Sequence, residues 1–127
     1  MRIEELHQLL EELTARDIET QWIEFKLRAG SITNEQIGEY ISAMSNGATI
    51  SNQAFGYLVW GINDTTHEVK GTNFCFTIAK QGNQDLELWM RNLLHPKITF
   101  EIFEFDYHGN NVVMLRIPSA KGEPTKF

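Results

Sequence analysis

The sequence predicts an α+β fold in which helices cover a mixed β-sheet. Segments with the apolar spacing of amphipathic helices alternate along the chain with short apolar segments typical of strands. The last two strand-like segments follow each other across a short turn, which predicts an antiparallel hairpin beside strands joined by helical crossovers. A chain of 127 residues is long enough for one domain with a single core. The predicted order is helix, strand, helix, strand, helix, strand, strand.

The first two elements are an amphipathic helix and a half-buried strand. Residues 3–14 predict the helix, because their apolar side chains recur every three or four positions. Residues 22–28 predict the strand, because apolar and polar side chains alternate along them. This alternation places Glu24 and Lys26 on the same side of the strand, facing away from the core.

The next two elements are a capped helix and a central strand. Thr33 and Gln36 have the spacing of a capping box, which predicts that a helix begins there and ends near Asn46. Residues 48–54 are mostly polar and predict a loop. Residues 55–62 are apolar throughout, which is typical of a strand buried on both faces of a covered sheet.

The last elements are a third helix and a β-hairpin. Residues 82–94 show helical spacing, and a proline stops the pattern just beyond them. Residues 98–107 and 112–118 predict the two strands of the hairpin, joined by a turn containing glycine and asparagine. The adjacent apolar pair Ile102–Phe103 shifts the alternation by one position, and we therefore expect a β-bulge there.

The composition indicates a soluble globular domain. Apolar residues make up 42% of the chain, and no apolar run approaches the roughly 18 residues that a membrane span needs. The formal net charge is −6, but residues 1–19 alone hold six acids against two arginines, so the rest of the chain is close to neutral. Cys75 is the only cysteine, which excludes an internal disulfide and favours a cytoplasmic location.

Several short motifs, in this order, resemble one known family. They are WIEFK, ISAMSN, GYLVWGIND, VKG, HPKI and a terminal hairpin that ends in Ile-Pro. Together, across roughly residues 15–118, they resemble the AlbA_2 domain of bacterial transcriptional regulators and of the Schlafen proteins of animals. The resemblance implies an Alba-like β-α-β-α-β-β core, here with one extra N-terminal helix. It also implies that residues 1–127 form the N-terminal module of a longer protein with further domains after it.

The first function that the resemblance implies is nucleic-acid binding, with no catalysis or cofactor. The candidate contacts with DNA or RNA are Trp22, Lys26, Arg28, Asn46 and Lys70. Cationic side chains bind phosphates, and an aromatic ring can stack on a base. Alternatives from the residues themselves stay open: Trp22 can pack under the first helix, Asn46 can cap its helix, and the lysines can be ordinary solvated surface.

The second implied function is a metal-dependent ribonuclease, as described for some Schlafen relatives. Its three-carboxylate cluster falls on Glu19, Glu24 and Asp64, and Mg²⁺ or Mn²⁺ would be needed only for this activity. Hard cations take oxygen ligands and hold phosphate oxygens during strand cleavage. The alternatives are an exposed ion pair between Glu24 and Lys26 and an ordinary turn at Asp64. The residues leave open whether the domain is an enzyme.

A third function class is a protein-interaction or dimerisation domain, with the acidic first helix as the partner surface. A homodimer is compatible with all three classes, because symmetric pairs are the commonest oligomers. The four histidines show no metal-like spacing to one another or to Cys75, which argues against a zinc site. We therefore expect a DNA-binding domain of a bacterial transcriptional regulator, with the other two classes as alternatives.

Overall fold

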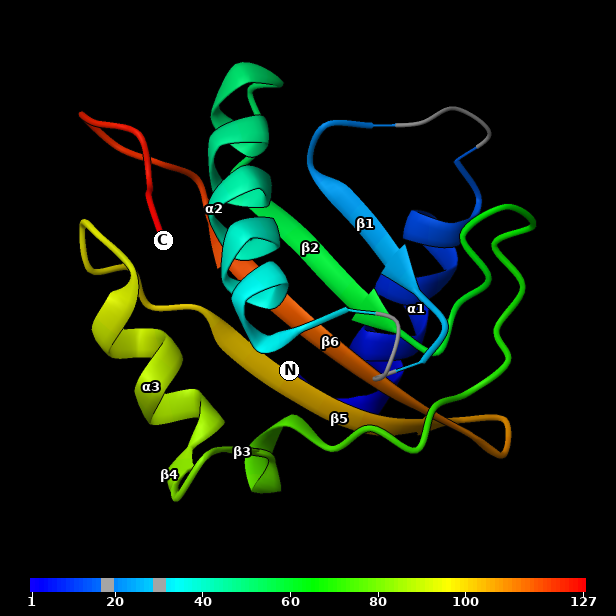
Figure 1. Ribbon diagram of the computed structural model, residues 1–127. Coiled ribbons are helices and arrows are strands. Elements are labelled where there is room, and N and C mark those ends of the chain that lie inside the picture. Colours follow the sequence, from blue (N-terminus) through cyan, green and yellow to red (C-terminus); the bar gives the residue numbers. More distant parts are fainter. Residues whose placement is uncertain (17–19, 29–31) are drawn as a thin grey trace.

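A four-stranded mixed sheet forms the centre of the computed structural model, which describes residues 1–16, 20–28 and 32–127 (Figure 1). In sheet order the strands are β1 (Ile23–Lys26), β2 (Phe55–Trp60), β6 (Asn110–Pro118) and β5 (Glu101–Tyr107). β1 runs parallel to β2, whereas β6 runs antiparallel to both of its neighbours, β2 and β5. The predicted mixed sheet with a closing hairpin is confirmed.

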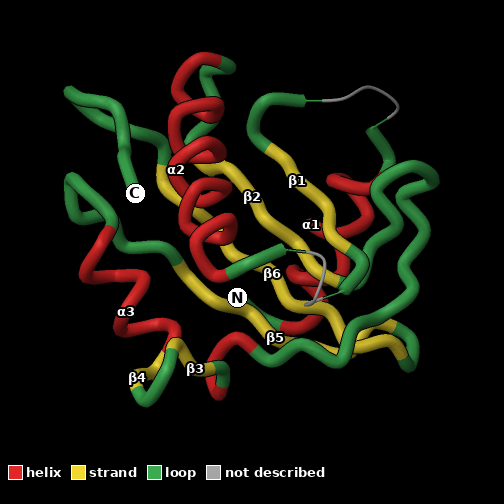
Figure 2. Tube along the Cα trace, in the orientation of Figure 1, coloured by secondary structure: helices red, strands yellow, loops and turns green. Residues whose placement is uncertain are grey.

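Helices cover both faces of this sheet. α1 (Ile3–Thr14) packs on one face, and α2 (Asn34–Ile50) and α3 (Leu86–Leu93) pack on the other (Figures 1 and 2). Between β2 and α3 the chain forms a 3₁₀ turn, η2, and a small two-stranded sheet. These elements are η2 (Phe76–Ile78), β3 (Lys80–Gln81) and β4 (Gln84–Asp85). Among the described helices, none combines the length and apolar character that crossing a membrane requires.

The two faces of the sheet bury two separate apolar clusters. In β2, Leu58 and Trp60 pack on the side of α2 and α3, whereas Tyr57 and Val59 pack on the side of α1. All four side chains are buried, because helices lie against both faces. The uninterrupted apolar run predicted for the central strand is therefore confirmed.

The observed boundaries differ from the predicted ones in α2 and α3. The capping box at Thr33 is present, but α2 continues to Ile50 through part of the predicted loop. Ala48 is fully buried there, so tertiary packing extends the helix past Asn46, near which it was expected to end. α3 begins at Leu86, because residues 82–85, which were expected to be helical, form β4 and the turn between β3 and β4.

The predicted β-bulge at Ile102–Phe103 is wrong. β5 and β6 pair in one continuous register from Glu101 opposite Arg116 to Tyr107 opposite Asn110. Ile102 packs against the cluster under α2 and α3, and Phe103 packs against the cluster under α1. Adjacent apolar residues need no bulge here, because each face of the sheet has its own apolar layer.

Candidate nucleic-acid interface

An open groove of about 1070 Å³ lies where three loop regions meet beyond the sheet. One wall is the end of the β1 segment, another is the chain that leaves β2, and the third is the turn between β5 and β6. Figure 2 shows the end of β1, the start of the chain after β2 and the turn between β5 and β6 on the side of the molecule opposite the C-terminus. The chain after β2 continues along the groove to Ala79, which contacts the start of α3. The groove is thus formed by loops that the rigid sheet holds in place.

The lining of the groove is basic and rich in amides. Its cationic members are Arg28 and Lys70. Its asparagines are Asn63, Asn73, Asn110 and Asn111. Among the described residues that line it, none is acidic, although the whole chain carries a net charge of −6. Cations and amide groups, with no carboxylate among the described lining residues, form a surface suited to phosphate and to base edges.

A hydrogen-bonded loop after β2 positions Asn63 and Lys70. The Gly61 carbonyl accepts bonds from the backbone N–H of Lys70 at 2.8 Å and of Gly71 at 2.9 Å. Gly61 and Gly71 have φ values of +102° and +83°, in the left-handed region that favours glycine. At the outer end, the Asn63 side-chain oxygen accepts the N–H groups of two following residues, Thr65 and Thr66, both at 2.9 Å.

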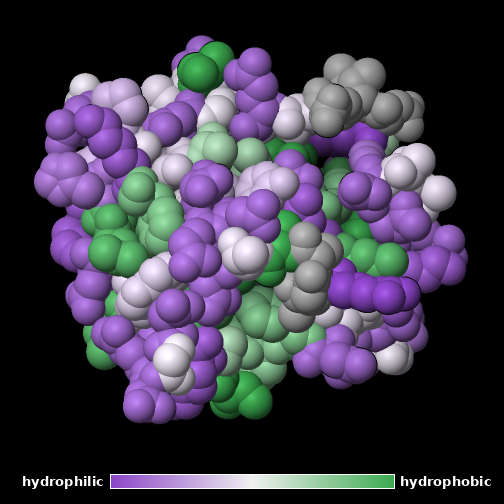
Figure 3. All heavy atoms as spheres, in the orientation of Figure 1, coloured by the Kyte–Doolittle hydropathy of each residue, from purple (hydrophilic) through white to green (hydrophobic). Residues whose placement is uncertain are grey.

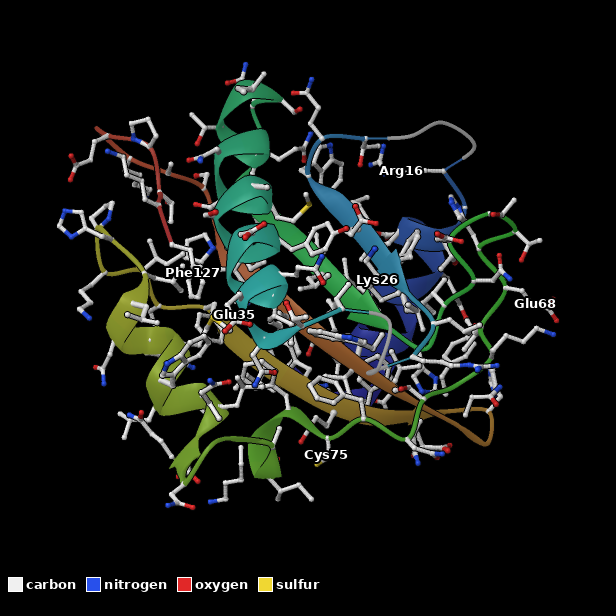
Figure 4. The ribbon with its side chains drawn as sticks, viewed as in Figure 1. Arg16, Lys26, Glu35, Glu68, Cys75 and Phe127 are labelled. Carbon is white, nitrogen blue, oxygen red and sulfur yellow. The ribbon has the colours of Figure 1, made fainter. Side chains whose placement is uncertain are left out.

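Lys70 is partly neutralised by a neighbour. Its ammonium lies 3.2 Å from a Glu68 carboxylate oxygen, and both side chains are more than half exposed. Such an exposed pair contributes only about 0–1 kcal/mol, so a phosphate can compete for the lysine. Glu68 (labelled in Figure 4) lies on the same loop, at the right of the view. Lys70 therefore remains available to an anion at a modest cost.

A second, smaller pocket of about 120 Å³ lies beside the groove and contains the predicted carboxylates. Glu24 and Asp64 both line it. Its other polar members are Arg16, Thr20 and His67, and its apolar wall is formed by Leu13, Ile23 and Phe25. These are two of the three carboxylates that the resemblance implies, and their role stays a prediction. Glu19, the third predicted carboxylate, lies outside the described residues.

The pocket offers oxygen donors but an incomplete metal-binding set. The Thr20 hydroxyl is buried and has no hydrogen-bond partner. In the described parts of the chain, no three His, Cys, Asp or Glu side chains gather closely enough to hold a metal ion. Two carboxylates and a hydroxyl suit a hydrated hard cation that keeps several waters. The residues present therefore fit Mg²⁺ or Mn²⁺ only as a partial set.

His67 fixes the wall of this pocket. Its Nδ1 atom lies 3.2 Å from the Thr14 carbonyl at the end of α1, and its ring meets Phe25 edge-on with centroids 4.9 Å apart. If Nδ1 carries the proton for that bond, Nε2 is left as an acceptor. Sequence reasoning missed this residue, because its partners lie 53 and 42 positions away and no local pattern connects them.

Glu24 and Lys26 form an ion pair on the α2 side of β1. Their charged atoms are 3.6 Å apart, and the side chains are 30% and 16% exposed, respectively. The Lys26 ammonium also lies 4.5 Å from the centre of the Tyr40 ring on α2. Burial opposes the charge of Lys26, but a hydrogen bond to the Tyr40 hydroxyl and the Glu24 carboxylate outweigh it, so the pKa is raised above 10.5. Lys26 (labelled in Figure 4) is therefore held by the protein and is less open to phosphate than expected.

Two other candidate contacts lie in different surroundings from those expected. Trp22 is only 7% exposed and packs in the cluster under α1, so the expected aromatic surface is corrected to a buried position. Asn46 lies inside α2 and caps no helix end. Its amide exchanges two hydrogen bonds with the backbone of Thr125, at 2.9 and 2.8 Å, which occupies the groups that a phosphate contact would need.

Of the five predicted contacts, Arg28 and Lys70 are the two that line the groove. The structure adds the groove's asparagines, which sequence reasoning did not single out. The available signal was their density between positions 63 and 73 and in the hairpin turn, next to glycines that permit close backbone approach. The three loops carrying them meet only in the folded protein.

Two of the solved structures with a similar fold are bacterial proteins. The N-terminal domain of an ATP-dependent DNA helicase RecG-related protein from Nitrosomonas europaea matches 95% of this chain and 76% of its own, with 22% identity and a TM-score of 0.59. The DIP2311 protein from Corynebacterium diphtheriae matches 97% of this chain, with 19% identity and a TM-score of 0.53. This chain spans only 23% of that second protein. At these identities the likeness is one of fold alone.

The family comparison is more specific. No curated protein sequence gives a significant match. The sequence model of the family described as "Schlafen, AlbA_2" matches residues 19–127, which is most of the chain and includes every strand of the central sheet. The chain belongs to the Schlafen AlbA_2 family.

Proposed function

We propose that this domain binds nucleic acid along the groove lined by Arg28, Lys70 and the four asparagines. The observation that carries the proposal is the lining itself, which combines cations and amides with no acidic side chain among its described members. A chain with a net charge of −6 repels polyanions as a whole, so any contact must be local. This groove is a surface where that condition is met.

The chemistry of the lining suggests a division of roles. Arg28 and Lys70 supply the charge for phosphate contacts, which position a nucleic acid without reading its sequence. Asparagine amides both donate and accept hydrogen bonds, and can therefore read base edges. With two cations, we expect moderate affinity that falls with added salt, with a log–log slope of about −1.4 for single strands and about −1.8 for duplex DNA.

Fluorescence anisotropy with labelled single-stranded DNA, duplex DNA and hairpin RNA tests the proposal. At about 50 mM salt, the double variant R28Q/K70Q should bind roughly 100-fold more weakly, because each lost phosphate contact costs about tenfold. Lys121→Gln is the matched control, because it removes one charge from the exposed segment after β6, on the opposite side of the molecule (Figure 1). Equal binding by wild type and double variant would reject the groove as the contact surface.

The wider setting that we propose is a cytoplasmic bacterial transcriptional regulator, with this domain reading DNA ahead of further domains. The family and the DNA helicase relationship of the Nitrosomonas protein support an association with nucleic acid. Binding of duplex DNA in preference to RNA in the same titrations would support the regulator. A preference for RNA would move the proposal to the second candidate.

The second candidate function is metal-dependent cleavage of RNA, favoured by the position of Glu24 and Asp64 in one pocket beside the groove. Both carboxylates would hold Mg²⁺ or Mn²⁺, and the bound ion would supply an activated water and stabilise charge on the phosphate. Asn63 lines the groove and Asp64 lines the pocket, so a strand held in the groove passes close to the carboxylates.

Incubation of hairpin RNA with Mn²⁺ tests this second function. Cleavage should appear with wild type and vanish in Glu24→Gln, whose circular dichroism should match wild type. The control is R28Q/K70Q, which should raise the RNA concentration needed for half-maximal rate and retain cleavage at saturation. RNA that stays intact with wild type at saturating concentrations would reject catalysis and leave the binding proposal standing.

A further inference from the structure

The C-terminal residues 119–127 lie between α2 and α3, where Figure 4 shows Phe127. This segment is held at its two ends. At the start, the Thr49 hydroxyl donates to the Ala120 carbonyl at 2.8 Å. At the other end, Thr125 is only 3% exposed, whereas residues 121–124 between the two anchors are all exposed. The anchor at residues 125–127 is thus joined to the domain by an exposed linker.

α2 recognises the main chain of this anchor. The Asn46 amide donates to the Thr125 carbonyl at 2.9 Å, and its oxygen accepts the Thr125 N–H at 2.8 Å. Beside it, the fully buried Ser45 hydroxyl lies 2.9 Å from the Thr125 hydroxyl. A side-chain amide that satisfies both backbone groups of one residue is a contact suited to any extended peptide.

The chain after α3 holds the anchor from the other side. The backbone of His95 accepts the Lys126 N–H at 2.6 Å and donates to the Lys126 carbonyl at 2.8 Å. These two bonds form an isolated antiparallel bridge. Thr125 and Lys126 are therefore recognised as backbone from opposite directions, which is how an added strand is recognised at an exposed edge.

A shaped site accepts the last side chain. A Cβ atom placed on Gly38 of α2 would lie 2.2 Å from the Phe127 ring, so the glycine leaves the space that the ring fills. The Phe127 ring meets Trp89 of α3 edge-on, with centroids 5.6 Å apart. In Figure 3, apolar atoms appear at the surface where this segment crosses between the two helices.

We propose that this groove between α2 and α3 is a peptide-binding site that takes residues 125–127 of a second copy of this chain in place of its own. The fit of that segment is shown by the contacts above, and the chain of a second copy carries the same segment. Because the exposed linker adds little burial, binding within one chain differs from binding between chains mainly in effective concentration. Exchange of one segment is a low-cost route to a dimer.

Cleavage of the linker in the full chain tests whether the segment is a separable ligand. A protease recognition sequence is inserted between Gly122 and Glu123, and the folded protein is cut. We expect unchanged circular dichroism, loss of the fragment on dilution, and saturable rebinding of a labelled peptide of the same sequence. A peptide with Phe127→Ala should bind about 10- to 100-fold more weakly. Unfolding on cleavage, no rebinding, or equal binding of the two peptides would overturn the proposal.

Complementary variants of the 127-residue chain test exchange between copies. Phe127→Ala keeps the groove but spoils the segment, and Gly38→Val keeps the segment but blocks the groove. Each variant alone should be monomeric by light scattering, and an equimolar mixture should form a heterodimer with one intact contact. A mixture that stays monomeric at several hundred micromolar would overturn exchange. Neither experiment contains nucleic acid, so the outcome is independent of the groove lined by Arg28 and Lys70.

Discussion

Asn63 and Asp64 are neighbours in the chain, yet they line two sites of opposite electrical character. Asn63 belongs to the open groove, whose described lining has two cations and no carboxylate. Asp64 belongs to the small pocket, where it joins Glu24. The groove suits a polyanion, whereas the described lining of the pocket has a formal charge of −1, from two carboxylates and Arg16. The turn after β2 therefore separates the groove proposed to bind nucleic acid from the pocket that contains the carboxylates.

The contrast bears on how the proposed nucleic-acid surface is compatible with an acidic domain. The net charge of −6 is concentrated elsewhere, notably on α1, whose first turn alone carries Glu4 and Glu5. Local fields act over about one Debye length, roughly 8–10 Å at physiological salt. A groove free of carboxylates can therefore attract phosphate even though the whole molecule is acidic.

Replacing the side-chain amide of Asn63 by a carboxylate gives the largest expected effect on this contrast. Asn63→Asp places a carboxylate in the groove while keeping the oxygen that accepts the Thr65 and Thr66 N–H groups. Nucleic-acid affinity at about 50 mM salt should fall roughly tenfold, because one cation is then neutralised within the groove. Anisotropy titrations measure the change, and unfolding in urea should confirm unchanged stability.

Asp64→Asn is the matched control at the next position. It removes a charge from the pocket and none from the groove, so affinity without divalent metal should change by less than about twofold. Equal loss in the two variants would show that the groove and the pocket act as one site. A loss confined to Asp64→Asn would contradict the assignment of binding to the groove.

The second prediction concerns Glu68, which pairs with Lys70 at 3.2 Å at the rim of the groove. Glu68→Gln removes the anion that competes for Lys70. It keeps the length of the side chain at position 68 and the backbone contacts of that residue. We expect binding to strengthen about threefold, in keeping with an exposed pair worth 0–1 kcal/mol. The same variant on a K70Q background should give no gain, and an unchanged gain there would show that Glu68 acts on another cation.

The fold was predictable because its burial pattern repeats along the chain. The apolar spacing of residues 3–14 matches α1 residue for residue, since one helix face meets one core. The same reasoning failed at Ile102 and Phe103, because alternation assumes one buried face and this sheet has two. Boundaries failed where burial outweighed local propensity, as at Ala48.

The sites were predictable only in part, for a related reason. Glu24 lies within β1 and Asp64 in the turn after the neighbouring strand β2, and the parallel pairing of these two strands brings both residues to one pocket. Asn46 could not be assigned from its neighbours, since its partner Thr125 is 79 positions away. Trp22 follows the polar alternation of its strand but is buried under α1, a contact that depends on how the first helix packs.

The smallest expected effect on nucleic-acid affinity is that of Lys26→Met, although Lys26 lies only two residues before Arg28. Arg28 lines the groove, whereas the Lys26 ammonium is held by Tyr40 and Glu24. Lys26→Met should therefore change nucleic-acid affinity by less than about twofold. It should instead lower the free energy of unfolding at neutral pH by about 1 kcal/mol, through loss of the cation–π contact and the ion pair.

The pH dependence of that stability loss provides the decisive readout. The pKa of Lys26 is raised in the fold, so its contribution is complete below the unfolded value near 10.5 and disappears as pH rises through the folded value. Burial also raises the pKa of Tyr57, which lowers stability in the same alkaline window but equally in both proteins. Urea unfolding should thus show a gap between wild type and Lys26→Met that is constant up to about pH 10 and narrows above it. A gap that stays constant to pH 11.5 would mean that the lysine charge contributes nothing to stability, and would contradict the view that Tyr40 and Glu24 hold the Lys26 ammonium.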